Sequence, residues 1–120
     1  ACLPKEVSHK DAVYNLSRAA LFSASLLTGK YENLRTAVHD KLHQPYRMEL
    51  IPYGRDVFDI AYSLGAYASY VSGAGPSLMA IVDHENEFFV GKMRFALDKM
   101  GLNAWNVKEL EIDNKGTIIL

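Results

Sequence analysis

The sequence has little cysteine, proline or tryptophan and no long apolar run. Cys2 is the only cysteine in 120 residues, so the chain cannot form an internal disulfide or a paired-cysteine metal site. No apolar segment approaches the roughly 18 residues that a membrane-spanning helix needs. The N-terminal segment also lacks the basic-then-apolar order of a secretory signal peptide. A reducing, cytoplasmic location is therefore expected.

Excess charge of one sign is also absent. The chain has 13 Lys and Arg against 14 Asp and Glu, which gives a formal net charge of −1. This balance creates no long-range field that would attract nucleic acid or an anionic membrane, so neither is an expected partner. Hydrophobic residues make up 49% of the chain, which is enough to fill the core of one domain spanning residues 1–120.

The first predicted helix covers residues 8–28. Ser8 followed three residues later by Asp11 is a capping-box-like start. Gly29 supplies a residue that adopts the left-handed conformation cheaply at the helix end. The apolar residues that recur at helical spacing predict its buried stripe, namely Val13, Leu16, Ala20 and Leu27.

Three further helices are predicted, over residues 31–42, 52–64 and 85–100. Pro45 and Pro52 disfavour a continuous helix between the first two of them. Pro52 itself is expected at the first position of its helix, where its missing N–H costs nothing.

Strands are predicted at residues 67–71 and 78–82, and the short bend between them favours a hairpin. Two last strands are predicted at roughly residues 104–112 and 117–120, joined by a turn at residues 113–116. The order of elements predicts an α+β fold of two layers, with helices covering an antiparallel sheet of about four strands.

The bend between the two central strands contains Ser72, Gly73, Ala74 and Gly75. Successive N–H groups in such a run can form a concave nest that binds anions. The bend is not a P-loop, because GxxxxGK[ST] is absent and a strand follows it. The alternative is a tight hairpin turn whose glycines only supply positive φ, and the local pattern by itself favours this plainer reading.

Two other features of the sequence are candidates for ligand binding. Arg47 lies between two prolines on a segment expected to be irregular, from which its planar fork could hold a carboxylate or a phosphate. An ordinary salt bridge is the commoner alternative. His39 and His43 have the spacing of one helical face, but the segment lacks the Glu of HExxH and a third zinc ligand. A solvated or hydrogen-bonded pair is expected, and the pattern alone shows no catalytic or metal site.

Three segments taken together resemble the C-terminal half of the homoserine kinases. They are LPKEVSHKDAVYNLSRAALFSASLLTG, HDKLHQPYRMELIP and LGAYASYVSGAGPSLMAIV. SGAGPS resembles the third signature of the wider GHMP superfamily of small-molecule kinases, whereas LHQPYRMELIP resembles the homoserine kinases specifically. One departure is Ala68, where that family commonly has a second glycine.

The resemblance implies a ferredoxin-like C-terminal domain of an enzyme that phosphorylates L-homoserine with ATP, on the route to threonine. It implies that Arg47 binds the homoserine carboxylate and that Ser72 to Gly75 support the loop holding the nucleotide phosphates. The family's PxxxGLGSSAA loop and its acidic magnesium ligand are not in these 120 residues. ATP and Mg²⁺ are therefore expected to bind mainly to an N-terminal domain outside this sequence.

The chain is then expected to be a fragment that is inactive alone, holds no catalytic residue and pairs with its own N-terminal domain. Analogy with the family adds a homodimer. Two alternatives stay open: a superfamily kinase for another small alcohol, which the PYR segment disfavours, and a non-catalytic ligand-binding or dimerisation module. An upstream PxxxGLGSSAA-like loop would favour the kinase.

Overall fold

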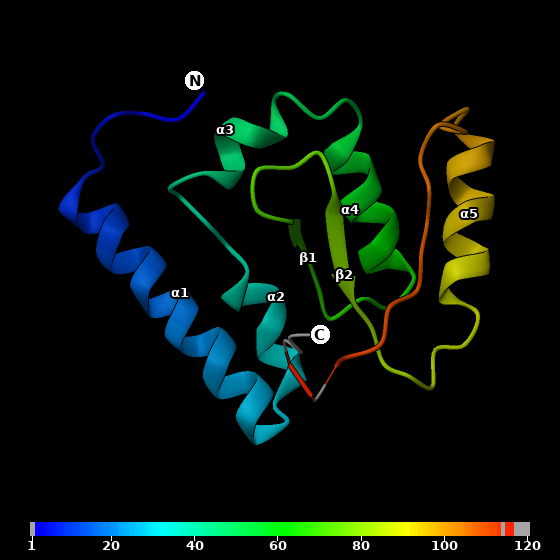
Figure 1. Cartoon of the computed structure of the whole chain (residues 1–120), viewed down its shortest axis with the longest axis horizontal. Helices are drawn as coiled ribbons and strands as arrows, with labels where there is room; N and C mark the ends of the chain where they lie inside the picture. The colour runs from blue at the N-terminus through cyan, green and yellow to red at the C-terminus, as the bar shows by residue number, and fades with distance from the viewer. Residues whose placement is uncertain (1, 114, 117–120) are drawn as a thin grey trace.

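The fold combines six helical segments with one β-hairpin in the residues that this computed structural model describes, 2–113, 115 and 116 (Figure 1). In chain order the elements are α1 (His9–Thr28), the 3₁₀ helix η1 (Tyr31–Asn33), α2 (Leu34–Ala37), α3 (Gln44–Met48), α4 (Gly54–Ser63), β1 (Ala68–Val71), β2 (Leu78–Ile81) and α5 (Phe89–Lys99). The two strands pair antiparallel, with Ala68 opposite Ile81 and Val71 opposite Leu78. The predicted α+β class and central hairpin are confirmed.

The ends of α1 follow the prediction. The hydroxyl of Ser8 accepts a hydrogen bond from Asp11 N at 3.0 Å and donates one to Asp11 Oδ2 at 2.7 Å. Gly29 ends the helix with φ +69°. Both ends depend on residues within a few positions of one another, which explains why the sequence predicts them correctly.

The predicted buried stripe of α1 is wrong. Leu16 and Leu27 are 71% and 88% exposed. The helix instead turns Phe22 and Ser25 inwards, with the Phe22 ring 6.3 Å from the Tyr70 ring of β1. Apolar residues occupy more than one side of this helix, so spacing alone cannot choose the side that meets the hairpin.

The segment after α1 also departs from the prediction. The helix expected over residues 31–42 ends at Ala37, and a short helix, α3, follows with Pro45 in its first turn. A proline is well accommodated there, because the first N–H groups of a helix have no partner within it. Pro52 does not begin the next helix, since α4 starts at Gly54.

Helices lie at both faces of the hairpin rather than in the predicted two layers. Ser69 and Val71 share one face with their cross-strand partners Ala80 and Leu78. Leu78 and Ala80 pack against the buried cluster formed by α4 and α5. Tyr70 on the opposite face contacts α1. The hairpin therefore lies between two pairs of helices, α1 and α2 on one side and α4 and α5 on the other (Figure 1).

The strand predicted at residues 104–112 is not formed. Trp105 and Val107 pack by their side chains on the α4–α5 cluster. Arg94 Nη2 donates a hydrogen bond to Val107 O at 2.8 Å, so a side chain occupies a carbonyl that a ladder would use. The predicted strand at residues 117–120 lies outside the described residues. Within the described part of the chain the sheet has two strands, not about four.

Candidate anion-binding site

The site lies where the β1–β2 turn approaches α3. Within the turn, Ser72 N donates to Ser77 O and Gly75 N donates to Ser72 O, both at 2.9 Å. Gly73 and Gly75 have φ of +54° and +75°. The N–H groups of Gly73 and Ala74 have no protein acceptor in the described part of the chain. Both residues are exposed, so these two donors are free to meet a ligand.

Gly75 is required by space as well as by its backbone angle. A Cβ built on Gly75 would lie 3.2 Å from Ile51 Cδ1 and 3.3 Å from Val71 Cγ1. Both neighbours belong to the buried cluster beneath the turn. A Cβ on Gly73 would meet nothing within 4 Å. The turn therefore rests on the core at Gly75 and faces outward at Gly73.

Arg47 reaches this turn from α3. Its Nη1 donates a hydrogen bond to Ala74 O at 2.9 Å. Its Nε is buried and has no partner, and no carboxylate of the described residues lies within 4.0 Å of the guanidinium. A buried polar group without a partner is uncommon in folded proteins. The structure thus brings together Arg47 and the turn residues that the sequence singled out separately, and leaves donors of the arginine unused.

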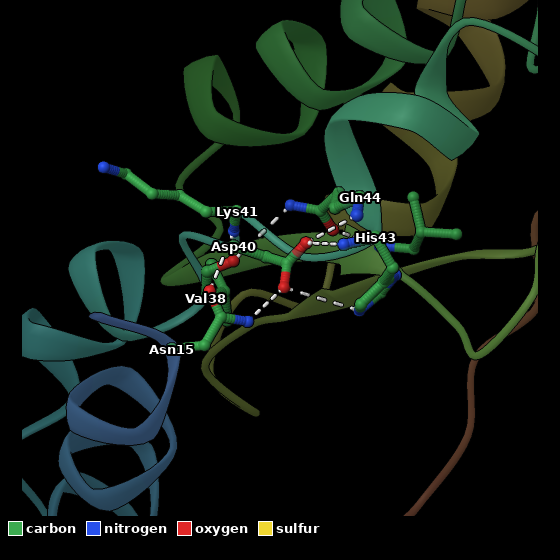
Figure 2. Close-up of polar contacts among 7 residues, drawn as sticks. Asn15, Val38, Asp40, Lys41, His43 and Gln44 are labelled. Carbon is green, nitrogen blue, oxygen red and sulfur yellow. Dashed lines mark hydrogen bonds and ion pairs between the residues drawn. The ribbon is translucent and has the colours of Figure 1, made fainter. Parts of the chain in front are cut away.

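Asp40 anchors the start of α3 (Figure 2). Its Oδ2 accepts hydrogen bonds from His43 N at 2.7 Å and Gln44 N at 2.5 Å, and its Oδ1 accepts one from Asn15 Nδ2. Burial raises the pKa of this carboxyl, but the backbone bond from Gln44 and the bonds from Asn15 and His43 outweigh burial. The pKa of Asp40 therefore lies below its ordinary value, and the group is ionised at neutral pH.

The histidine pair does not form the helical face that its spacing indicated, because α2 ends at Ala37. His43 Nε2 lies 3.8 Å from Asp40 Oδ1, and His39 is exposed. Over residues 2–113, 115 and 116, no three or more His, Cys, Asp or Glu side chains are grouped so that they could hold a metal ion.

Two hollows lie beside this region. One of about 250 Å³ is lined by α3 and α4 residues together with Asp40, and one of about 370 Å³ extends from Gln44 towards Arg35 and Ser69. Neither is lined by Arg47 or by the turn. None of the described helices is long and apolar enough to cross a membrane.

Sequence reasoning missed Asp40 and Gln44, which tie α3 to its neighbours. A partial signal was available, because Pro45 is a residue that favours the first turn of a helix and an Asp lies a few residues before it. Arg47 of α3 and the turn with its two unpaired N–H groups are neighbours, joined by the bond from Arg47 Nη1 to Ala74 O. Such a set of donors is suited to bind carboxylate or phosphate groups.

Comparison with known proteins places the chain in a family. The family described as "GHMP kinases C terminal" matches residues 19–98. A homoserine kinase of Clostridium beijerinckii is 51% identical over 118 residues, which are 98% of this chain and 39% of that protein. One of Aquifex aeolicus is 43% identical over 115 residues, covering 95% of this chain and 38% of that protein.

A solved structure agrees with these sequence matches. The crystal structure of homoserine kinase from Cytophaga hutchinsonii superposes with a TM-score of 0.71 at 27% identity, over 82% of this chain and 32% of that one. The chain spans about two fifths of the length of the curated relatives it matches, given the 39% coverage. Sequence match, fold and turn together show that this chain belongs to the C-terminal family of the GHMP kinases.

Proposed function

We propose that the chain is the substrate-side, C-terminal part of an ATP-dependent homoserine kinase. The reaction transfers the γ-phosphoryl group of ATP to the hydroxyl oxygen of L-homoserine, giving O-phospho-L-homoserine and ADP, and belongs to cytoplasmic threonine biosynthesis. Relatives named homoserine kinase, up to 51% identical over nearly the whole chain, support this assignment.

The main support for this proposal is the position of the Arg47 guanidinium. It is hydrogen-bonded to Ala74 O of the turn and has no carboxylate partner among the described residues. An arginine fork matches a carboxylate in geometry and charge. We assign Arg47 to the carboxylate of L-homoserine. A substrate carboxylate would supply the counter-charge that this half-buried arginine lacks among the described residues.

Ser72, Gly73, Ala74 and Gly75 are assigned to support of the nucleotide phosphates. The N–H groups of Gly73 and Ala74 have no acceptor among the described residues, so they could donate to a phosphate oxygen. ATP supplies the phosphoryl group and Mg²⁺ neutralises its charge when both are bound. Both ligands are assigned mainly to the N-terminal part of the longer kinase, as the family resemblance implies.

That N-terminal part is the proposed main partner of this chain. Phosphoryl transfer depends on positioning the phosphates and neutralising their charge, and these 120 residues contain no PxxxGLGSSAA loop. We therefore expect the chain alone to be inactive. ADP release by the purified chain above a no-protein blank would contradict this expectation. A homodimer of the complete kinase remains part of the proposal.

The test measures ATP-dependent phosphorylation of L-homoserine by the natural polypeptide that carries these residues. Arg47→Ala removes the fork, and Arg47→Lys keeps the charge without it. Losing charge-assisted hydrogen bonds of about 1.5–3 kcal/mol should raise the KM for homoserine roughly 10- to 100-fold. The KM for ATP should change little, because Arg47 is assigned to the substrate carboxylate and not to the nucleotide.

Arg55→Ala is the matched control, since it removes an exposed arginine from α4, outside the turn. It should leave both KM values unchanged. If the Arg47 variants match this control, the substrate role of Arg47 is refuted. If the folded polypeptide phosphorylates another small alcohol and not homoserine, the chain belongs to a different kinase of the same superfamily.

A further inference from the structure

Arg47 is one of two side chains of α3 that bond to the hairpin. Gln44 Oε1 accepts a hydrogen bond from Val71 N at 2.7 Å, at the last residue of β1. Arg47 Nη1 donates to Ala74 O at 2.9 Å. Residues three apart share one side of a helix. The two hydrogen bonds, from Val71 N to Gln44 and from Arg47 to Ala74 O, therefore join the same side of α3 to the hairpin.

The helix that makes these two bonds cannot hold its own position. α3 has five residues, far fewer than the roughly 12–15 that an isolated helix needs in water. Its N-cap residue, His43, makes no side-chain capping bond. Contacts with the rest of the fold must therefore fix α3, and they determine where the guanidinium of Arg47 lies.

Asp40 provides the cap that His43 does not. Its carboxylate accepts the N–H groups of His43 and Gln44, and its side chain is only 9% exposed. Asn15 of α1 donates to Asp40 and accepts from Lys41 N at 2.9 Å. Figure 2 shows these contacts converging on Asp40. The start of α3 is thereby fastened to the long helix α1.

Gln44 fastens the same turn of α3 on its other side. Besides accepting from Val71, it donates from Nε2 to Val38 O at 3.4 Å, so both ends of its amide are engaged (Figure 2). Methionine at this position would fill similar space but could form neither bond. Glutamate could still accept from Val71 N but could not donate to Val38 O.

We propose that Asp40 and Gln44 are positioning residues for Arg47, which set its guanidinium against Ala74 in the orientation that receives the substrate carboxylate. Asp40 fixes the start of α3, and Gln44 fixes its register along β1. Neither residue is assigned a contact with substrate. The expected change in KM rests on the proposed function. The expected change in the conformational order of the Arg47 side chain rests on the structure alone.

The kinetic test is a double-mutant cycle in the natural polypeptide that carries these residues. Gln44→Met should raise the KM for homoserine about 10-fold while the KM for ATP stays within about twofold, because one misplaced hydrogen-bonding group has this order of effect. With Arg47→Ala already present, Gln44→Met should add no further increase. Asp40→Asn should behave in the same way, and Gln44→Glu should recover part of the loss.

Leu34→Ala is the control for lost stability. Leu34 is fully buried and belongs to α2, outside α3 and the turn. It should lower the melting temperature without raising the KM for homoserine. If Gln44→Met raises that KM by the same factor with and without Arg47, Gln44 acts independently of the arginine and the positioning proposal is wrong.

A second measurement separates this proposal from the substrate assignment. The side-chain Nε–H of Arg47, observed by ¹⁵N NMR relaxation, should be ordered in the parent protein and disordered in Gln44→Met. Unchanged order in Gln44→Met overturns the positioning role whatever the enzyme does. If Arg47→Ala leaves the KM for homoserine unchanged while Gln44→Met still disorders Arg47, the substrate assignment fails and the positioning role stands.

Discussion

Replacing Gly75 with alanine tests how the turn is seated on the core. The substitution adds one methyl group 3.2 Å from Ile51 Cδ1 and 3.3 Å from Val71 Cγ1. Ile51 and Val71 are only 6% and 3% exposed, so the added methyl group must displace neighbours that are packed in the core. Gly73→Ala is the matched control, because it also places alanine at positive φ but meets nothing within 4 Å.

The two variants share one cost and differ in another. Alanine in the left-handed conformation costs about 1–2 kcal/mol at either position. Overpacking a close-packed core costs a further amount of about 1–3 kcal/mol. The lower half of that range applies at Gly75, because the end of the Ile51 side chain can shift by a few tenths of an ångström. Gly75→Ala should therefore be less stable than Gly73→Ala by about 1–2 kcal/mol.

Thermal unfolding followed by circular dichroism measures the difference. For a chain of this size, about 1–2 kcal/mol corresponds to a melting temperature roughly 4–8 °C lower in Gly75→Ala than in Gly73→Ala. Equal melting temperatures would mean that the core does not confine the turn at Gly75. A larger loss in Gly73→Ala would show that the outward part of the turn is the constrained one.

Two further predictions concern stability. Leu34→Ala should lower the free energy of unfolding by about 2–5 kcal/mol. Leu27→Ala, at a side chain 88% exposed, should change it by less than about 0.5 kcal/mol. Urea unfolding measures both values, and a similar loss in the two variants would mean that the inward side of α1 is misassigned. The pKa of Asp40 is lowered from its ordinary value of 3.8 in the folded protein. The Asp40 carboxylate therefore contributes to the free energy of unfolding above pH 3.8, and this contribution is lost as the pH falls through the lower pKa of the folded state. Unfolding measured by Trp105 fluorescence from about pH 6 to pH 2 should therefore show a shallower acid-side loss in Asp40→Asn, and an identical loss would contradict the role of Asp40.

The sequence predicted the elements whose signals are local. Ser8 and Gly29 bound α1 as expected. The alternating pattern before the Gly-Pro bend and the short apolar run after it located the two strands. Arg47 and the turn were also singled out in advance. Their contact was not predicted, because the hydrogen bond from Arg47 to Ala74 joins residues 27 positions apart. Spacing along the chain carries no information about such a pair.

The sequence failed where a choice depended on a distant partner. It could not tell which side of α1 meets the hairpin, and it assigned a strand to residues 104–112, which pack by their side chains instead. Strand pairing needs a free edge, and helix burial needs an opposing surface; neither is encoded in a local period.

The α+β class, the hairpin turn and the family motifs follow from the amino-acid sequence alone, because caps, turns and periodicity act within a few residues. The presence and the position of α3 depend instead on tertiary contacts. Its five residues are stabilised by Asp40, by Asn15 of α1 and by the bond from Gln44 to β1. A helix too short to form alone takes its position from its neighbours, so the placement of Arg47 beside the turn appears only in the folded chain.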